Sequence, residues 1–286
     1  MSQSNSVGLI DLQIMWNRLI AVVEEQAQTL MRTAFSPIVR ECGDLSAGVF
    51  DLQGRMLAQA VTGTPGHVNS MAESVKHFLR HFPVETMKPG DAYITNDPWM
   101  GTGHIHDVNI AMPIFDKGKI VAFAAVVSHM PDIGGRIRNA GIRDIYEEGL
   151  QIPQLKLINA GKPDQNLLDM IGQNVRVPEQ TLGDIWAQVA ACKMLEERLR
   201  PLLRDTDLKS LGDEIRRRSG NSSGLPVLSS SSIAAIRAAV NIGREPANGI
   251  ASFSKLTQDI PSPEGRLEVF RSLTEHYPEE AHFWAH

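Results

Sequence analysis

Several classes of protein need residues that this chain has in short supply. Only two of its 286 residues are cysteine, Cys42 and Cys192, which argues against a disulfide framework and against a cysteine-based zinc site. Aromatic residues make up 6% of the chain, and the formal net charge is -5. Because nucleic-acid binding uses a basic face and aromatic stacking platforms, no nucleic-acid partner is expected.

Long apolar runs are also missing. The longest, IVAFAAVV at residues 120–127, is too short to cross a bilayer. The first residues, MSQSNSVGLIDLQIMW, lack the basic stretch and the apolar core of a signal peptide. Two distant cysteines favour a reducing compartment. The sequence therefore predicts a soluble cytoplasmic protein with no membrane partner.

The chain contains no motif for binding nucleotide phosphates or for serine-hydrolase catalysis. The patterns GxxxxGK[ST], GxGxxG after a strand, and GxSxG are all absent. The glycine-rich stretches TGTPGH and GTGH carry no lysine for phosphates. If the reaction needs ATP, we expect another chain to bind it.

Hydrophobic periodicity predicts a mixture of helices and strands. Helical spacing occurs at residues 8–35, 70–82, 165–176 and 180–203. Strand patterns occur at 45–60, interrupted by a turn at 51–54, in a short stretch after the Pro-Gly turn of KPGDAYITNDP, and at 108–116 and 119–129. Since short turns join consecutive strands, we expect an α+β fold of antiparallel strands flanked by helices, with the functional site at strand ends.

The composition changes near residue 204. Residues 205–232 are polar and serine-rich, which is typical of a linker. Residues 233–286 contain helical patches that resemble half of a helical repeat, and one such unit cannot bury its own apolar face. The expected organisation is one domain at 1–204, a linker at 205–232 and an extra helical tail at 233–286.

Three polar residues are spaced as metal ligands. His104 and Asp107 stand three apart at the start of one predicted strand, and His129 closes the next. If the two strands form an antiparallel hairpin, that start and that end meet at the same edge of the sheet. Histidine and carboxylate donors suit Zn, Mn or Fe(II). The alternative is that these histidines hydrogen-bond to backbone carbonyls near strand ends.

Two further aspartates allow two interpretations each. Asp44, directly before an apolar strand, is either a fourth ligand or a turn or capping residue. His67 is expected at an exposed position where a helix starts. Asp132 is either a loop cap or a carboxylate that orients a ligand histidine.

Three more residues, in the segment NDPWMGTGHIHD, also have two possible roles each. Asn96 and Asp97 either initiate a turn or hydrogen-bond to a metal ligand and so orient it. His106 is either a ligand or a solvated neighbour, and its side chain should point away from that of Asp107 in an extended segment.

Six stretches occur in one order over about residues 8–204: ECGDLSAGVFDLQGRMLAQA, TPGHVNSMAESV, GDAYITNDPWMGTGHIHDVNIAMPIF, SHMPDIGGR, YEEGLQIPQLKL and NVRVPEQTLGDIWAQVAAC. Together they resemble the hydantoinase B/oxoprolinase family. That family includes the B subunits of ATP-dependent hydantoinases, the corresponding half of 5-oxoprolinase, and related subunits of acetone and acetophenone carboxylases.

The resemblance implies a divalent metal, either Zn, Mn or Fe. The family's metal ligands fall on Asp44, His104, Asp107 and His129. His67 and Asp132 also match family positions near the site, and we expect His67 to carry protons and Asp132 to orient a histidine.

Two positions depart from the family pattern. His106 stands where many members have proline, and Met130 stands where many have a second histidine. Neither removes an implied ligand, but both bear on substrate preference.

The resemblance also implies a reaction in two subunits. An A subunit would bind ATP and phosphorylate the oxygen of a small cyclic amide, and this metal-dependent subunit would open the ring, as a hydrolase in a hetero-oligomer. One alternative is a subunit of an ATP-dependent ketone carboxylase. Another is a non-catalytic, truncated remnant that binds a partner, because no family motif is found after about residue 204.

Overall fold

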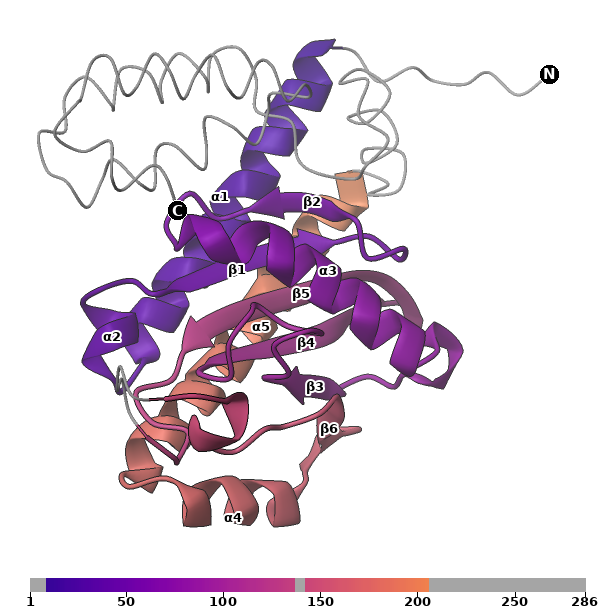
Figure 1. Cartoon of the computed structure of the whole chain (residues 1–286). Coiled ribbons are helices and arrows are strands. Elements are labelled where there is room, and N and C mark those ends of the chain that lie inside the picture. Colours follow the sequence, from indigo (N-terminus) through magenta and orange to yellow (C-terminus); the bar gives the residue numbers. More distant parts are fainter. Residues whose placement is uncertain (1–8, 137–141, 206–286) are drawn as a thin grey trace, which may run out of the picture. The chain divides into compact units, whose positions relative to one another are not determined.

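The computed structural model describes residues 9–136 and 142–205, which form a three-layer α+β fold (Figure 1). Within these ranges the sheet has seven strands in the order β2-β1-β5-β4-β3-β6-β7, and each neighbouring pair is antiparallel. The strands are β1 Leu45–Phe50, β2 Met56–Gln59, β3 Ala92–Thr95, β4 Asp107–Asp116, β5 Lys119–His129, β6 Leu155–Asn159 and β7 Lys162–Pro163. The predicted antiparallel sheet with flanking helices is confirmed.

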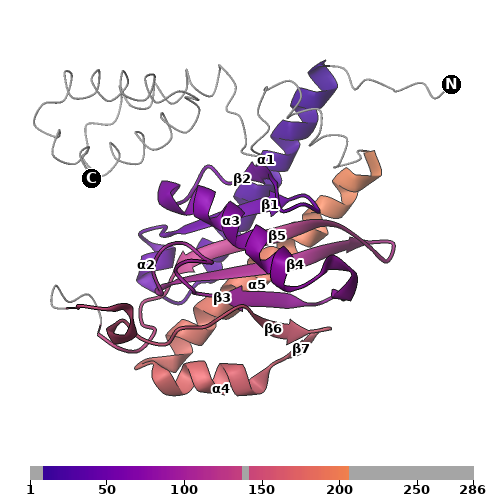
Figure 2. The ribbon, with the colours of Figure 1, turned by 45° about the vertical axis from the view of Figure 1, so that its right-hand side comes forward.

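Helices cover both faces of the sheet, as Figures 1 and 2 show from two directions. They are α1 Leu9–Thr33, α2 Pro37–Arg40, α3 Pro65–His81, α4 Gln165–Asn174 and α5 Pro178–Asp205, with short 3-10 turns η1 Val84–Thr86 and η2 Ile145–Glu147. Helices α1 and α5 pack against each other and against one face, α4 packs on α5, and α3 covers the opposite face.

Strand β5 shows why both faces need a helical cover. Neighbouring residues of a strand point to opposite sides of the sheet. Those directed towards α1 and α5 are Ala122, Ala124 and Val126, and those directed towards α3 are Phe123, Ala125 and Val127. The strand is therefore apolar on both sides, and it lies between β1 and β4, as its composition predicts.

Helix α3 begins at Pro65 rather than at residue 70. Thr64 has an extended conformation as the N-cap residue, and the fixed φ of Pro65 suits the first helical position. His67 consequently lies in the first turn of the helix. The expectation that His67 is exposed is wrong, since only 7% of the residue is accessible.

Strands β6 and β7 and the short helix α2 were not expected. Strand β6 pairs with β3, and its sequence LKLIN is too short to show a clear alternation. Its conformation is set by pairing with a strand far away in the sequence. The predicted linker beyond residue 205 and the predicted tail at 233–286 lie outside the described residues.

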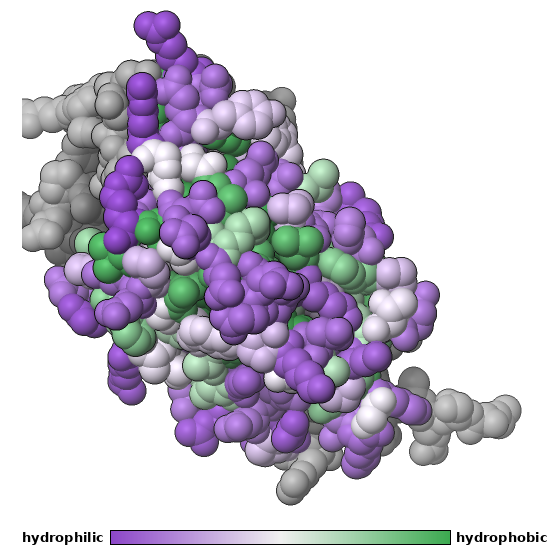
Figure 3. Space-filling view, turned by 90° about the horizontal axis from the view of Figure 1, so that it is seen from below, coloured by the Kyte–Doolittle hydropathy of each residue, from purple (hydrophilic) through white to green (hydrophobic). Residues whose placement is uncertain are grey.

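The described surface is mixed in character. The face seen from below in Figure 3 is largely hydrophilic, with apolar residues in small separate groups. Among the described helices, none combines the length and the apolar character needed to cross a membrane.

Asp91 ties the start of β3 to its surroundings. Its side chain is fully buried and accepts hydrogen bonds from the amides of Lys88 and Ala160, the Tyr93 hydroxyl and the Lys156 ammonium. Burial alone would raise the pKa of Asp91, but these hydrogen bonds outweigh it and lower the pKa below its ordinary value.

Replacing Asp91 with asparagine is expected to destabilise the fold in a pH-dependent way. A carboxyl whose pKa is lower in the folded state adds stability above its unfolded pKa of 3.8, and this stability is lost as the pH falls through the folded pKa. The difference in unfolding free energy between wild type and Asp91→Asn should therefore be largest near neutral pH and shrink in acid. Urea unfolding at several pH values measures it, and a difference independent of pH would contradict the assignment.

Candidate metal centre

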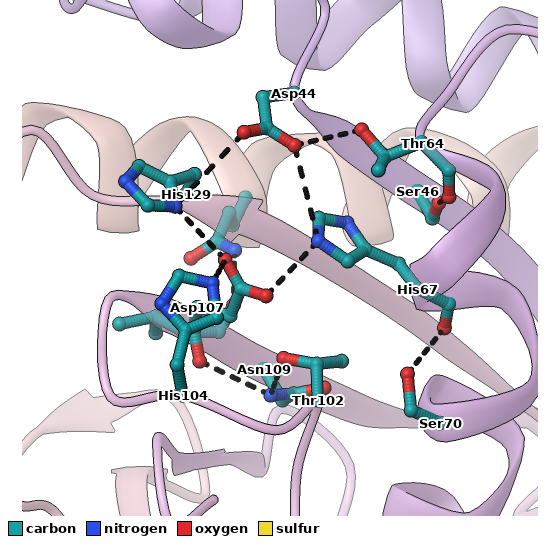
Figure 4. Close-up of polar contacts among 12 residues, drawn as sticks. Asp44, Ser46, Thr64, His67, Ser70, Thr102, His104, Asp107, Asn109 and His129 are labelled. Carbon is teal, nitrogen blue, oxygen red and sulfur yellow. Dashed lines mark hydrogen bonds and ion pairs between the residues drawn. The ribbon is translucent and has the colours of Figure 1, made fainter. Parts of the chain in front are cut away.

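The candidate site lies where β1 and β4 begin and β5 ends, on the face that α3 covers (Figure 4). Asp107 is the first residue of β4 and pairs directly with His129, the last residue of β5. Asp44 immediately precedes β1, and its carbonyl accepts a hydrogen bond from the His129 amide at 3.1 Å. The pairing of β4 with β5 therefore brings Asp107 and His129 together, as the hairpin argument expects, and the pairing of β5 with β1 adds Asp44.

Asp107 is the centre of the cluster. Its Oδ1 lies 3.0 Å from Nε2 of His104 and 3.2 Å from Nδ1 of His129. Its Oδ2 lies 2.9 Å from Nε2 of His67, which reaches in from the first turn of α3. The Asp107 side chain is 1% exposed, so three imidazoles converge on one buried carboxylate.

Asp44 borders the cluster and also contacts the start of α3. Its Oδ2 lies 3.9 Å from Nδ1 of His129, and its Oδ1 lies 3.8 Å from Nε2 of His67. The same Oδ1 accepts a hydrogen bond from the hydroxyl of Thr64, the N-cap residue of α3, at 2.7 Å. Asp44 thus links the start of β1 to the start of the helix that carries His67.

The donor atoms could hold a divalent metal. His104, Asp107 and His129 each offer one ligand atom, and these atoms lie within 4.8 Å of one another. Ligands at about 2.1 Å from one metal ion lie about 3 to 4 Å apart, so small movements would suffice. Imidazole and carboxylate donors without thiolate suit Zn, Mn or Fe.

The electrostatics of the cluster favour a charged carboxylate. Burial raises the pKa of Asp107, but hydrogen bonds from the three imidazoles outweigh it and hold the pKa far below its usual range. The hydrogen bond to Asp107 raises the pKa of His104 against the opposing effect of burial. Asp107 is therefore anionic at neutral pH, as a metal ligand must be.

His106 is buried rather than solvated. Its ring stacks on that of His129, with centroids 5.3 Å apart and an interplanar angle of 11°. Burial, together with the neighbouring His129 and His104, lowers the pKa of His106 to about 4. A neutral imidazole therefore packs against the ring of His129 at physiological pH. Met130, the other departure from the family pattern, is fully buried in the core.

Asp132 acts as a loop cap in the structure. Its Oδ1 accepts hydrogen bonds from the Gly134 amide at 2.8 Å and from Nη1 of Arg176 at 2.9 Å. Its Oδ2 accepts from the Arg176 amide at 2.5 Å, and Nη2 of Arg176 donates to the Gly135 carbonyl at 2.6 Å. The orientation of a histidine by Asp132 remains a prediction.

The structural roles of Arg176 and Asn109 escaped the sequence analysis. Arg176 is 44 residues from Asp132, and no local pattern connects them. Asn109 is 2% exposed, and its Nδ2 donates to the carbonyl of Asp107 at 3.2 Å. Asn109 follows Asp107 by one strand period, so the alternation of β4 could have placed it on the same face.

Fold and site together define a class: α+β proteins with an antiparallel sheet between helices and a buried histidine–carboxylate cluster at one end of it. The family model described as Hydantoinase B/oxoprolinase matches residues 9–223. The chain belongs to the hydantoinase B/oxoprolinase family, which confirms the resemblance that its motifs carry.

Three known proteins illustrate the similarity. The caprolactamase subunit beta of Pseudomonas jessenii is 31% identical over 202 residues, which cover 70% of this chain and 34% of that protein. The 5-oxoprolinase 1 of Arabidopsis thaliana is 29% identical over 202 residues, covering 65% of this chain and 16% of that protein. The crystal structure of ATP-dependent caprolactamase from Pseudomonas jessenii matches with a TM-score of 0.66 and 28% identity, covering 75% of this chain and 38% of that chain.

The chain therefore spans about a third or less of the length of these curated relatives. The described residues contain the cluster and the sheet that positions it. The substrate, the partner and the activity of a whole protein are matters for a proposal.

Proposed function

We propose that this chain is the metal-dependent subunit, or part of it, of an ATP-dependent enzyme that hydrolyses a small cyclic amide. The observation that carries the proposal is the convergence of His104, His129 and His67 on the buried carboxylate of Asp107. The names of two relatives add the substrate class, because caprolactam and 5-oxoproline are both cyclic amides.

The proposed metal ligands are Asp44, His104, Asp107 and His129. A divalent ion supplies a Lewis acid for a carbonyl or phosphoryl oxygen and lowers the pKa of water. Asp107 holds two of the histidines in place through Oδ1, and the stacked ring of His106 restricts that of His129.

His67 is the proposed proton carrier. Its Nε2 lies 2.9 Å from Oδ2 of Asp107, and its place in the first turn of α3 directs the ring at the cluster. Imidazole takes up and releases protons near neutral pH, which suits a residue that delivers a proton to an opening ring.

ATP would be bound by a separate A-type subunit. The sequence has no phosphate-binding motif, and the solved relative is titled an ATP-dependent caprolactamase. Phosphorylation of the amide oxygen in that subunit would make the ring carbon easier to attack. The working protein would then be a hetero-oligomer.

Elemental analysis of the purified protein tests the metal directly. We expect about one Zn, Mn or Fe per chain in the wild type, and loss of that metal in His104→Ala, since a ligand is removed. The matched control is His77→Ala, a partly buried histidine of α3 that belongs to none of the cluster contacts described above. A folded wild type without metal, or an unaltered metal content in His104→Ala, would sink the proposal.

Ring opening then tests the substrate class. Caprolactam and 5-oxoproline should be hydrolysed only when ATP, an A-type subunit and the metal-loaded chain are present together. Carboxylation of acetone in place of ring opening would point to the ketone carboxylase alternative.

A further inference from the structure

The loop between β3 and β4, residues 96–106, carries His104, and Asn96 joins its two ends, which we call the neck of the loop. Asn96 is fully buried and directly follows β3. Its Nδ2 donates a hydrogen bond to the carbonyl of Ile105 at 2.7 Å, across the two ends of the loop. The bond therefore spans the segment from which His104 reaches Asp107.

Asn96 also connects this loop to a second one. Its Nδ2 donates to the Leu150 carbonyl at 2.9 Å, and its Oδ1 accepts from the Ile152 amide at 2.5 Å. The amide of Leu150 in turn donates to the carbonyl of Ile133 at 2.7 Å, in the loop that follows His129. One side chain thus joins the backbone segments on both sides of the cluster.

The middle of this loop, residues 97–101, has contacts of its own. Oδ1 of Asp97 accepts hydrogen bonds from the amides of Trp99 and Met100 at 2.9 and 3.2 Å. Gly101 lies directly against Asn109, because a Cβ on Gly101 would come within 2.9 Å of the Asn109 Nδ2. Residues 97–101 therefore have contacts of their own, and the Asn96 side chain holds the two ends of the loop together.

We propose that Asn96 is a positioning residue that sets the separation between His104 and His129 at which both imidazoles reach Asp107. Its role in metal binding rests on the proposed function. Through these three hydrogen bonds the Asn96 side chain joins its own segment to two others, at Ile105 and at residues 150–152, so the ligands are ordered before a metal arrives. Ordering them during binding instead would reduce the affinity.

The test variant is Asn96→Asp. It keeps the size of the side chain and the acceptor for the Ile152 amide, but it cannot donate to Ile105 and Leu150. We expect its affinity for zinc, measured by competition with a chromophoric chelator, to be about 10- to 100-fold weaker than that of the wild type. Asn96→Ser, which is uncharged and too short to span the neck, provides a second variant if the first does not fold.

The matched control is Asp91→Asn. Asp91 and Asn96 flank β3 at its two ends, and each is a fully buried side chain that ties separate backbone segments together. Both substitutions should lower the stability of the metal-free protein. Only those at Asn96 should weaken zinc binding, because Asp91 is at the end of β3 away from the cluster. Equal weakening by both, or unchanged affinity in both Asn96 variants, would overturn the proposal.

Hydrogen exchange of the metal-free protein separates this proposal from the proposed function. Amides in residues 97–106 should exchange faster in Asn96→Asp and Asn96→Ser than in the wild type or in Asp91→Asn. If the wild type binds no Zn, Mn or Fe, the proposed function fails, and faster exchange in the Asn96 variants still supports the positioning role of Asn96. Unchanged exchange in this segment would overturn the positioning role whatever the metal result.

Discussion

Asp107→Asn is expected to weaken metal binding severely and to lower the pKa of His104. The hydrogen bond to Asp107 is the main cause that raises the pKa of His104, and asparagine carries no charge to stabilise an imidazolium. Nuclear magnetic resonance titration of the metal-free protein measures this pKa. The affinity for zinc should fall by more than about 100-fold, because loss of a supporting residue alone costs 10- to 100-fold.

Asp116→Asn is the matched control for this substitution. Asp116 is the last residue of the same strand, and it pairs with Lys119 at the hairpin turn, away from the cluster. It should leave both the pKa of His104 and the affinity for zinc unchanged. An unchanged His104 pKa in Asp107→Asn would show that the carboxylate does not hold the imidazole as described.

Gly135→Ala is expected to destabilise the fold strongly. Gly135 has a φ of +56°, and a Cβ there would lie 2.5 Å from the carbonyl oxygen of Glu147 and 2.5 Å from the carbonyl carbon of Glu148. Backbone atoms cannot rotate away as a flexible side chain can. We expect a loss of about 3 kcal/mol or more in unfolding free energy, which urea unfolding measures.

Gly161→Ala is the control that distinguishes the cost of the steric clash at Gly135 from the cost of a positive φ. Gly161 also has a positive φ, +83°, but a Cβ there would meet nothing within 4 Å. Its replacement should cost only the conformational penalty of about 1 to 2 kcal/mol. If both substitutions cost the same, the close approach at Gly135 does not contribute.

The centre of the cluster could be predicted because its geometry is local. The turn at residues 116–118 and the alternating strands fix an antiparallel hairpin, and that hairpin places Asp107 opposite His129. His104 follows from its spacing of three residues from Asp107. The residue pattern alone could not decide whether Asp44 is a ligand, since an aspartate before a strand is common in turns.

The rest of the site depends on contacts between distant segments. The start of α3 was misjudged because Pro65 and Gly66 look like loop residues, although proline is favoured at the first helical position. The partnership of Asp132 with Arg176 and that of Asn96 with Leu150 and Ile152 join segments with no shared periodicity. Such pairs become visible only once the strands are assembled.

Strand pairing holds part of the cluster in place, whereas the remaining part lies on a loop. Asp107 and His129 belong to paired strands, and Asp44 immediately precedes the strand on the other side of β5, so the spacing of their backbones changes only if the pairing between β1, β5 and β4 breaks. His104 comes from the connecting loop, and its side chain is 40% exposed. An ion would therefore enter and leave past His104. Its dissociation rate would depend on how often that loop opens, and not on transient separation of the paired strands.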